Sequence, residues 1–512
     1  MMSRRNFIQT GIGAGLGACV LVRQQSFAQQ CSPASQPSEG IVFETIRTDG
    51  LAHLSYFIGD RSTGHAVVID PRRDVEVYLE LARKHHLTIS HALETHIHAD
   101  FVSGSRELAA RSGTAKVYVS IEGGALYGFA HEPLRNGSRI ELGRVVLTAM
   151  HTPGHTPEHM AYLATDRGKP WGFFSGDFLF AGSVGRPDLL GADQTPGLAK
   201  ALFRSMRTAL APLADDVPLY PAHGAGSPCG ANIGDRQSNI GYERQHNPAL
   251  QFIDEAEFID WVLRTAPPMP RYYPRMKKIN ALGPEVLNGL PDIEWMEPQL
   301  FQQRLAVGDV QLIDNRTMLG FGGGHIAGAW NIGPRPELSL WAGWMLDPEK
   351  PIALVLQRDE DLAEVQRQFL RVGFTKFAGV LKGGMEAWVT AGLPAQALVQ
   401  LPVQELNGQM SERDFQLLDV RLPGEWDQGH LPGAQYLFLG DLPRKLKELN
   451  ANKPVVVYCA TGYRSSLAAS LLQASGFKDV RNVPGSYTAW TAAGFPVVKP
   501  SDAKRKASDT KR

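Results

Sequence analysis

The chain has 512 residues, of which 43% are hydrophobic and 20% charged, with 52 Lys and Arg balancing 52 Asp and Glu. This length is too great for one hydrophobic core, and the composition is that of a globular protein, so several folded domains are expected and wholesale disorder is excluded. The zero net charge argues against nucleic acid as a partner. Four cysteines without a CxxC pair exclude a disulfide framework and a zinc ribbon.

The first 28 residues are predicted to be an export signal. Arg4 and Arg5 precede a glycine-rich, weakly apolar stretch that ends in small residues suited to cleavage. This pattern resembles a twin-arginine signal peptide, which exports folded proteins, and it predicts a periplasmic location. The sequence around Cys19 also resembles a lipoprotein box, so a membrane-anchored lipoprotein with a lipid on Cys19 is the alternative. Residues 29–40, rich in Ser, Pro and Gln, are predicted to be a linker.

Residues 41–265 have the pattern of an α/β domain. Short apolar segments at 66–70, 89–93 and 145–150 predict strands, and apolar residues at helical spacing predict a helix over 75–86. The proline-rich residues 266–295 are predicted to form a stiff connector.

Beyond the connector, an internal repeat predicts two copies of one α/β unit, over 296–395 and 400–500. A Leu-X-Asp-X-Arg segment precedes His325 in the first copy and His430 in the second at the same spacing. Residues 501–512 are basic, contain no large apolar side chain and are predicted to be a solvated tail.

A metal site is predicted in the first domain because several potential ligands follow strands and lie next to Gly or Pro. They occur in four short motifs, HxHxD, PGHT, SGD and PAHG, and comprise His96, His98, Asp100, His155, Asp177 and His223. Any one histidine would more simply be a surface or core residue. Four such motifs at strand-to-loop junctions favour a shared metal site.

These motifs, in this order and spacing, resemble the metallo-β-lactamase fold, an αββα sandwich with a metal at the edge of its sheets. Residues 94–104 are, more narrowly, similar to persulfide dioxygenases of that fold. The resemblance implies iron ligands at His96, His155 and Asp177, a set that suits Fe(II) binding substrate and O₂ together.

One departure from the hydrolytic members concerns the number of metals. These enzymes usually have a histidine after the aspartate of HxHxD, whereas this chain has Phe101, which carries no donor atom. The change favours a single Fe(II) per chain, with Zn²⁺ as the alternative. His98, Asp100 and His223 would then orient the ligands and bound water. Arg186 is a candidate for binding an anionic substrate group, with a structural salt-bridged role as the alternative.

A cysteine loop marks the second repeat as a candidate catalytic domain. An apolar strand ends at Cys459, and Gly462, Arg464 and a helical segment follow. Backbone N–H groups of the loop, the helix N-terminus and Arg464 should stabilise a thiolate. The Cys-x4-Arg-Ser pattern resembles a rhodanese active loop and is one residue shorter than related phosphatase loops, which favours sulfur as cargo. Cys459 would then be the nucleophile that carries a persulfide.

The first repeat is predicted to be an inactive rhodanese-like domain. Position for position, Leu356 replaces the cysteine and Asp361 replaces the arginine of the second copy. The thiol and the positive charge are both missing, so a structural or docking role is expected for residues 296–395.

The sequence as a whole predicts an α/β multidomain enzyme that joins a persulfide dioxygenase to a sulfurtransferase. A low-molecular-weight persulfide such as glutathione persulfide and O₂ would give sulfite and a thiol, and Cys459 would transfer sulfane sulfur between persulfide, sulfite and thiosulfate. One alternative is a zinc hydrolase of thioesters or lactams. Another is a sulfur-relay protein in which only the rhodanese chemistry operates. The oligomeric state is left open, a homo-oligomer included.

Overall fold

The computed structural model of the chain describes residues 39–411 and 414–499. The predicted signal peptide, most of the linker, Cys19 and the basic tail lie outside this part. None of the helices in the two described ranges combines the length and the apolar character that a membrane span requires.

The first domain is a sandwich of two six-stranded sheets. The first sheet contains, in order, β1 (Ile41–Thr48), β2 (His53–Asp60), β3 (His65–Ile69), β4 (Thr88–Leu93), β5 (Lys116–Ser120) and β6 (Glu132–Leu134). The second contains, in order, β14 (Ser238–Asn239), β13 (Pro218–Pro221), β10 (Lys169–Gly176), β9 (Met160–Asp166), β8 (Val145–His151) and β7 (Arg139–Glu141). A separate ribbon pairs β11 (Leu179–Phe180) with β12 (Ser183–Val184).

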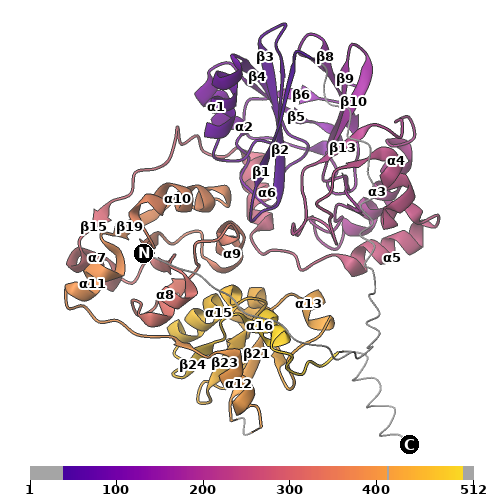
Figure 1. Cartoon of the computed structure of the whole chain (residues 1–512). Coiled ribbons are helices and arrows are strands. Elements are labelled where there is room, and N and C mark those ends of the chain that lie inside the picture. The colour runs from indigo at the N-terminus through magenta and orange to yellow at the C-terminus, as the bar shows by residue number, and fades with distance from the viewer. Residues whose placement is uncertain (1–38, 412–413, 500–512) are drawn as a thin grey trace, which may run out of the picture. The chain divides into compact units, whose positions relative to one another are not determined.

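The alternating direction of side chains along the strands explains why the sheets stack and why helices cover them (Figure 1). In β3, Val67 and Ile69 belong to the core between the two sheets, whereas Ala66 and Val68 belong to the core beneath the helices of the first sheet. Successive side chains of a strand point to opposite faces, so a continuous apolar run serves both cores. The covering helices are α1 (Glu76–His85) and α2 (Ser105–Ser112) on the first sheet, and α3 (Thr195–Thr208), α4 (Ile240–His246) and α5 (Glu255–Thr265) on the other. The predicted αββα sandwich is confirmed.

The two repeats have the same topology, each with a parallel five-stranded sheet. The first has the order β15 (Trp295–Met296), β19 (Phe377–Leu381), β18 (Ile352–Val355), β16 (Gln311–Asp314) and β17 (Trp330–Asn331). The second has the matching order β20 (Val399–Gln400), β24 (Val480–Asn482), β23 (Val455–Tyr458), β21 (Gln416–Asp419) and β22 (Gln435–Tyr436). Two rhodanese-like α/β domains therefore follow the sandwich, as predicted.

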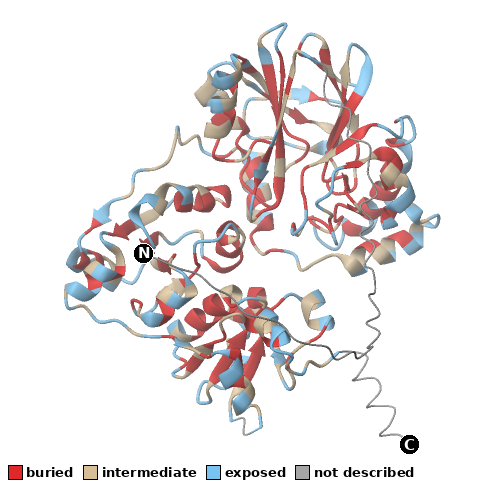
Figure 2. Ribbon diagram, viewed as in Figure 1, coloured by how far each residue is buried: buried red, intermediate tan, exposed pale blue. Residues whose placement is uncertain are grey.

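Helices surround both of these sheets. The first repeat has α7 (Pro298–Ala306), α8 (Met318–Gly323), α9 (Leu338–Met345), α10 (Leu362–Arg371) and α11 (Gly384–Thr390). The second has α12 (Val403–Gln409), α13 (Pro423–Asp427), α14 (Leu442–Lys445), α15 (Tyr463–Ala474) and α16 (Ser486–Ala492). Figure 2 shows α15 buried along most of its length, and its run of buried residues from Ser465 to Leu472 covers every face of the helix. A helix buried on all faces has neighbours on the side away from its own sheet.

The predicted stiff connector contains a helix, α6 (Tyr273–Leu282). Pro274 lies in its first turn, where the missing N–H of proline costs no hydrogen bond. The helix packs against the loop that follows β4. The Asn280 side-chain amide donates to the carbonyl oxygens of His98 and Phe101 at 2.9 and 2.8 Å, and its oxygen accepts the N–H of Ser103 at 2.9 Å. The segment is thus part of the support for the predicted metal-binding loop.

Candidate functional site

Three predicted ligands meet at the edge of the sandwich. His96 follows β4, His155 lies in the turn between β8 and β9, and Asp177 follows β10. Asp177 Oδ2 lies 3.3 Å from His155 Nε2 and 3.9 Å from His96 Nε2. These three atoms are buried and have no hydrogen-bond partner. Unpartnered buried polar atoms are costly, so their convergence fits a bound cation.

The other nitrogen of each histidine fixes the tautomer that a metal requires. His155 Nδ1 lies 2.9 Å from the Arg186 carbonyl oxygen, which can only accept, so Nδ1 carries the proton. The Thr95 hydroxyl donates to Asp70 Oδ2 at 2.8 Å and must therefore accept from His96 Nδ1 at 2.9 Å. Burial also lowers the pKa of both histidines, which keeps them neutral. Both Nε2 lone pairs are thus directed at the site.

His223 and Asp100 orient the carboxylate of Asp177. His223 Nδ1 lies 2.7 Å from Asp177 Oδ1, and its Nε2 lies 2.8 Å from Asp100 Oδ2. Burial alone would lower the pKa of His223, but the two carboxylates outweigh it and raise this pKa to about 10. A charged His223 donates to both carboxylates, which leaves Asp177 Oδ2 free to face the site.

His98 lies beside the site without contributing an atom to it. Its Nε2 contacts Asp70 Oδ1 at 3.1 Å and Glu94 Oε2 at 3.0 Å. Burial lowers its pKa, but these carboxylates outweigh burial and raise it well above the usual value. Nε2 of His98 is therefore engaged by carboxylates, and His98 supports the loop through Asp70, which also holds Thr95. Its predicted role in orienting ligands stays a prediction.

Phe101 packs against His98 and His53. Its ring centroid lies 4.5 Å from that of His98 and 4.1 Å from that of His53, and the side chain is buried. Asp100, His223 and Cys229 also cluster. Both nitrogens of His223 are engaged by carboxylates, however, and burial raises the pKa of the Cys229 thiol. This second group is therefore less suited to a metal than the first, and the single ion per chain stays a prediction.

Arg186 is placed against protein groups. Its guanidinium makes a two-pronged ion pair with Asp188 at 2.7 and 2.8 Å and donates to the Pro228 carbonyl oxygen at 3.2 Å. The side chain is 2% exposed. This arrangement favours the structural alternative, in which Arg186 shapes the loop whose carbonyl orients His155. Substrate binding by its guanidinium stays a prediction.

Two residues near the site, Lys277 and Asp70, were missed by sequence reasoning. Lys277 of α6 donates from Nζ to the Ile97 carbonyl oxygen at 3.0 Å, and burial lowers its pKa despite the nearby Glu158 carboxylate. Nothing in a proline-rich segment indicated that it would reach the metal-binding loop. Asp70 could have been found, because it directly follows β3, the strand next to β4, and so lies at the same sheet edge.

The cysteine loop of the second repeat places the Cys459 sulfur against a backbone N–H and close to a helix N-terminus. Cys459 follows β23, is 1% exposed, and accepts the Gly462 N–H at Sγ at 3.1 Å. Gly462 has φ +105°, which only glycine adopts readily, and α15 begins at the next residue. The positive end of that helix lies beside the sulfur.

Arg464 faces a carboxylate. Its two terminal nitrogens contact the Glu425 oxygens at 2.6 and 2.7 Å. Burial tends to lower the pKa of Arg464, and its contacts with Glu425 and the nearby Cys459 raise it above the usual value. Glu425 therefore holds Arg464 close to the Cys459 sulfur. The role of Arg464 as a partner of the thiolate stays a prediction.

The corresponding loop of the first repeat contains no thiol. Leu356 is buried after β18, and Asp361 pairs with Arg358 at 2.6 Å.

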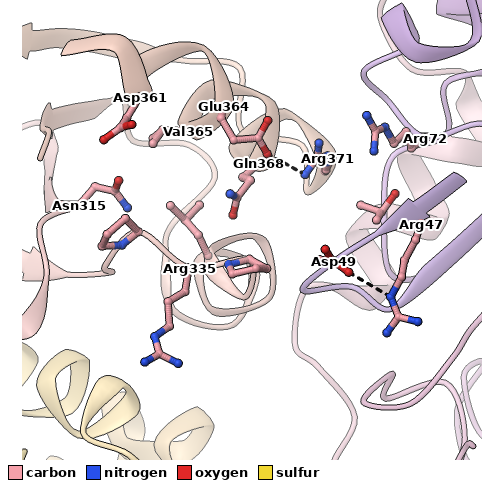
Figure 3. A pocket seen from close by; sticks show the side chains of 14 residues that line it. Arg47, Asp49, Arg72, Asn315, Arg335, Asp361, Glu364, Val365, Gln368 and Arg371 are labelled. Atoms are coloured by element: carbon pink, nitrogen blue, oxygen red, sulfur yellow. Dashed lines mark hydrogen bonds and ion pairs between the residues drawn. The ribbon is translucent and has the colours of Figure 1, made fainter. Parts of the chain in front are cut away.

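Asp361 lines a cavity of about 390 Å³ between this repeat and the first domain (Figure 3). Three arginines of this cavity, Arg47, Arg72 and Arg371, pair with neighbouring carboxylates, as Arg371 does with Glu364 at 3.3 Å. None of the predicted site residues lines the cavity.

Comparisons with known proteins match both parts of the chain. Residues 48–223 match the metallo-β-lactamase superfamily, and residues 297–391 and 402–493 each match the rhodanese-like domain. The chain is 29% identical to the human mitochondrial persulfide dioxygenase ETHE1 over 263 residues, which are 50% of this chain and 85% of that protein. It is 32% identical to a cytoplasmic hydroxyacylglutathione hydrolase of Arabidopsis thaliana over 175 residues, 33% of this chain and 63% of that protein.

A solved structure extends this similarity beyond the first domain. A metallo-β-lactamase from Staphylococcus aureus is 34% identical, with a TM-score of 0.60, over 67% of this chain and 98% of its own. The metal-ligand geometry, the αββα sandwich and these similarities agree. The chain belongs to the metallo-β-lactamase superfamily, as a member with ETHE1 persulfide dioxygenase homologues whose metal-binding domain is followed by two rhodanese-like domains.

Proposed function

We propose that the first domain is an Fe(II)-dependent persulfide dioxygenase. A persulfide, O₂ and water would give a thiol and sulfite: the terminal sulfur of the persulfide is oxidised, O₂ is reduced, and the S–S bond breaks. The observation that carries the proposal is the convergence of three unpartnered ligand atoms, from His96, His155 and Asp177. Two histidines and one carboxylate on one face leave positions for substrate and O₂.

The residues of this chain would prepare the site. His96 and His155 are held as neutral ligands by Thr95 and by the Arg186 carbonyl, and His223 holds Asp177. Burial of the ligands excludes bulk water and so protects reactive species. Fe(II) bound there would supply the one-electron chemistry that lets O₂ react with the persulfide sulfur.

A zinc hydrolase is the second candidate, because hydroxyacylglutathione hydrolases are also similar to the first domain. His96, His155 and Asp177 would then hold Zn²⁺, which would supply the Lewis-acid chemistry that thioester hydrolysis needs. Phe101, the carboxylate contacts of His98 Nε2 and the doubly engaged His223 disfavour the second metal that hydrolytic members hold.

We also propose that Cys459 transfers sulfane sulfur. Its thiolate attacks the outer sulfur of a persulfide, the donor S–S bond breaks, and the donor leaves as a thiolate. Sulfite then attacks the outer sulfur now held on Cys459, which releases thiosulfate and regenerates the thiolate. The first domain would supply that sulfite. The Gly462 N–H and the N-terminus of α15 support this role by stabilising negative charge on sulfur.

The deciding experiment measures O₂ uptake and sulfite formation after glutathione persulfide is added to the Fe(II)-reconstituted chain. Uptake with matching sulfite is expected. A protein that retains its iron yet consumes no O₂ would overturn the dioxygenase proposal. Hydrolysis of a glutathione thioester by the zinc-loaded chain would then favour the hydrolase, and thiosulfate sulfurtransferase activity alone would favour the sulfur relay.

Export is a separate proposal. The twin-arginine pattern around Arg4 and Arg5 supports a periplasmic location, with lipidation at Cys19 as the alternative. Cell fractionation of the full chain and of an Arg4→Lys, Arg5→Lys variant tests it, and an unchanged location of the variant would contradict it.

A further inference from the structure

The first repeat packs against the cysteine loop of the second. Helix α15 packs on its own sheet through one face, and its opposite face meets β17, an edge strand of the first repeat. Three residues of the first repeat make the contacts of interest, namely Met318, Asn331 and Arg335.

Met318 lies directly against Gly462. A side-chain carbon built at Gly462 would lie 2.6 Å from Met318 Sδ, so the thioether fills the space that any larger residue would need. The same sulfur lies 3.9 Å from the side-chain nitrogen of Asn482, which holds Ser465 at 2.6 Å through its oxygen. Because the Gly462 N–H donates to Cys459 Sγ, Met318 touches the residue that supplies this hydrogen bond.

Asn331 fixes the helix that follows the loop. Its Oδ1 accepts from the Ser466 hydroxyl at 2.6 Å, and its backbone N–H donates to the Ser470 hydroxyl at 2.9 Å. Its side-chain nitrogen donates to the carbonyl oxygens of Asp314 and Arg316 within the first repeat. All of its polar atoms used in these contacts are buried, so the junction is rigid and specific.

Arg335 covers the first residue of that helix. Its guanidinium carbon lies 5.5 Å from the centroid of the Tyr463 ring. Figure 3 shows this side chain pointing toward the pale yellow ribbon of the second repeat. No carboxylate of the described residues pairs with it within 4.0 Å, unlike Arg47 and Arg371 of the same cavity. The cation is thus available for the ring face.

We infer that the first repeat completes the sulfur-transfer site, and that Met318 is a positioning residue for the Gly462 N–H that binds the Cys459 sulfur. Asn331 and Arg335 hold the start of α15 in place through Ser466 and Tyr463. This inference rests on the proposed sulfur transfer at Cys459 and assigns a purpose to a domain that has no thiol of its own.

A merely structural contact would affect folding and leave the chemistry of the sulfur unchanged. The two roles differ in one measurable property, the pH profile of Cys459 alkylation by iodoacetamide. Without the Met318 side chain against it, Gly462 is free to move, and its hydrogen bond to the Cys459 thiolate weakens. The pH profile of alkylation then shifts toward higher pH.

The test compares three full-length variants with the parent chain. Met318→Ala should lower kcat for thiosulfate formation from glutathione persulfide and sulfite about tenfold, the scale of one weakened hydrogen bond to a charged group. Its alkylation profile should move by about one pH unit. Met318→Leu, which keeps the volume, should restore both. Leu319→Ala is the matched control, because Leu319 is the next residue and is 58% exposed.

Cys459→Ser separates the inference from the function on which it rests. If this variant still forms thiosulfate, the sulfur-transfer proposal fails. If it is inactive while Met318→Ala keeps the parent kcat and pH profile, the positioning role of Met318 is wrong. Quantifying O₂ uptake in every variant checks that the first domain is intact. Asn331→Ala removes the Ser466 contact together with the two hydrogen bonds to Asp314 and Arg316, and it should also lower kcat for thiosulfate formation. An unchanged kcat would contradict the role given to Asn331.

Discussion

Arg371 of the first repeat and Asp74 of the first domain form a buried ion pair. Two hydrogen bonds of 2.8 Å join the guanidinium to the carboxylate, and the two side chains are only 6% and 2% exposed. The Arg371 carbonyl oxygen also accepts the N–H of Val102 at 2.7 Å, two residues after Asp100. The repeat without a thiol therefore contacts the metal-binding loop as well as the cysteine loop.

Breaking this ion pair should destabilise the contact between the domains. Arg371→Ala leaves Asp74 buried without its main partner, which typically costs about 3–5 kcal/mol. We expect a clear fall in the thermal midpoint or a separate early transition in calorimetry. Arg367→Ala is the control, because Arg367 lies one turn away and its side chain is 31% exposed. Equal midpoints for the two variants would contradict the role given to Arg371.

Removing the proposed carboxylate ligand should abolish metal binding. Asp177→Asn keeps the shape of the side chain but removes the charge that faces both histidines. We expect loss of bound iron and of O₂ uptake, with thiosulfate formation from added sulfite intact. Metal content by mass spectrometry and the two assays check this. Loss of both activities in a folded variant would argue against two separate sites.

Weakening the support of that ligand should have a smaller effect. Asp100→Asn removes one of the two carboxylates that hold His223. Orienting partners of this kind contribute about 10–100-fold to metal affinity. Iron titration should therefore show weaker binding, with activity regained at high iron. An iron affinity equal to that of the parent chain would mean that His223 needs no second carboxylate.

Freeing the arginine of the cysteine loop should slow sulfur transfer. Glu425→Gln keeps a hydrogen-bonding group but removes the charge that holds Arg464. If Arg464 must stay beside the sulfur, the KM for an anionic acceptor such as sulfite should rise while O₂ uptake stays constant. Steady-state kinetics with varied sulfite measure this. A lower KM would mean that Glu425 instead competes with the substrate for Arg464.

The sequence predicted which candidate site residues lie together where metal-ligating side chains directly follow predicted strands. His96, His155 and Asp177 were identifiable because strand ends of stacked sheets lie at a common edge, and the structure brings their ligand atoms together there. The repeat was visible because the Leu-X-Asp-X-Arg segment and the following histidine recur at the same spacing, and the structure gives both copies the same strand order.

Contacts between distant segments could not be predicted in this way. Residue identity alone did not reveal that His98 is held by Asp70 and Glu94, or that Arg464 faces Glu425, because both depend on side-chain directions. The contact of Met318 with Gly462 spans 144 positions of the numbering and has no periodic signature. Alternation and motif spacing describe one element at a time, whereas these contacts arise from packing between elements.

The hydrogen bonds of Asn280 to the loop from His98 to Ser103 have a consequence for biosynthesis. A ribosome must translate 180 residues beyond Asp100 before the amide that secures this loop exists. A nascent chain released at residue 265 would contain every proposed iron ligand and still lack the Asn280 amide that holds the loop. Iron capture should therefore be a late event, completed after α6 has been made, and a fragment ending before α6 should incorporate iron poorly.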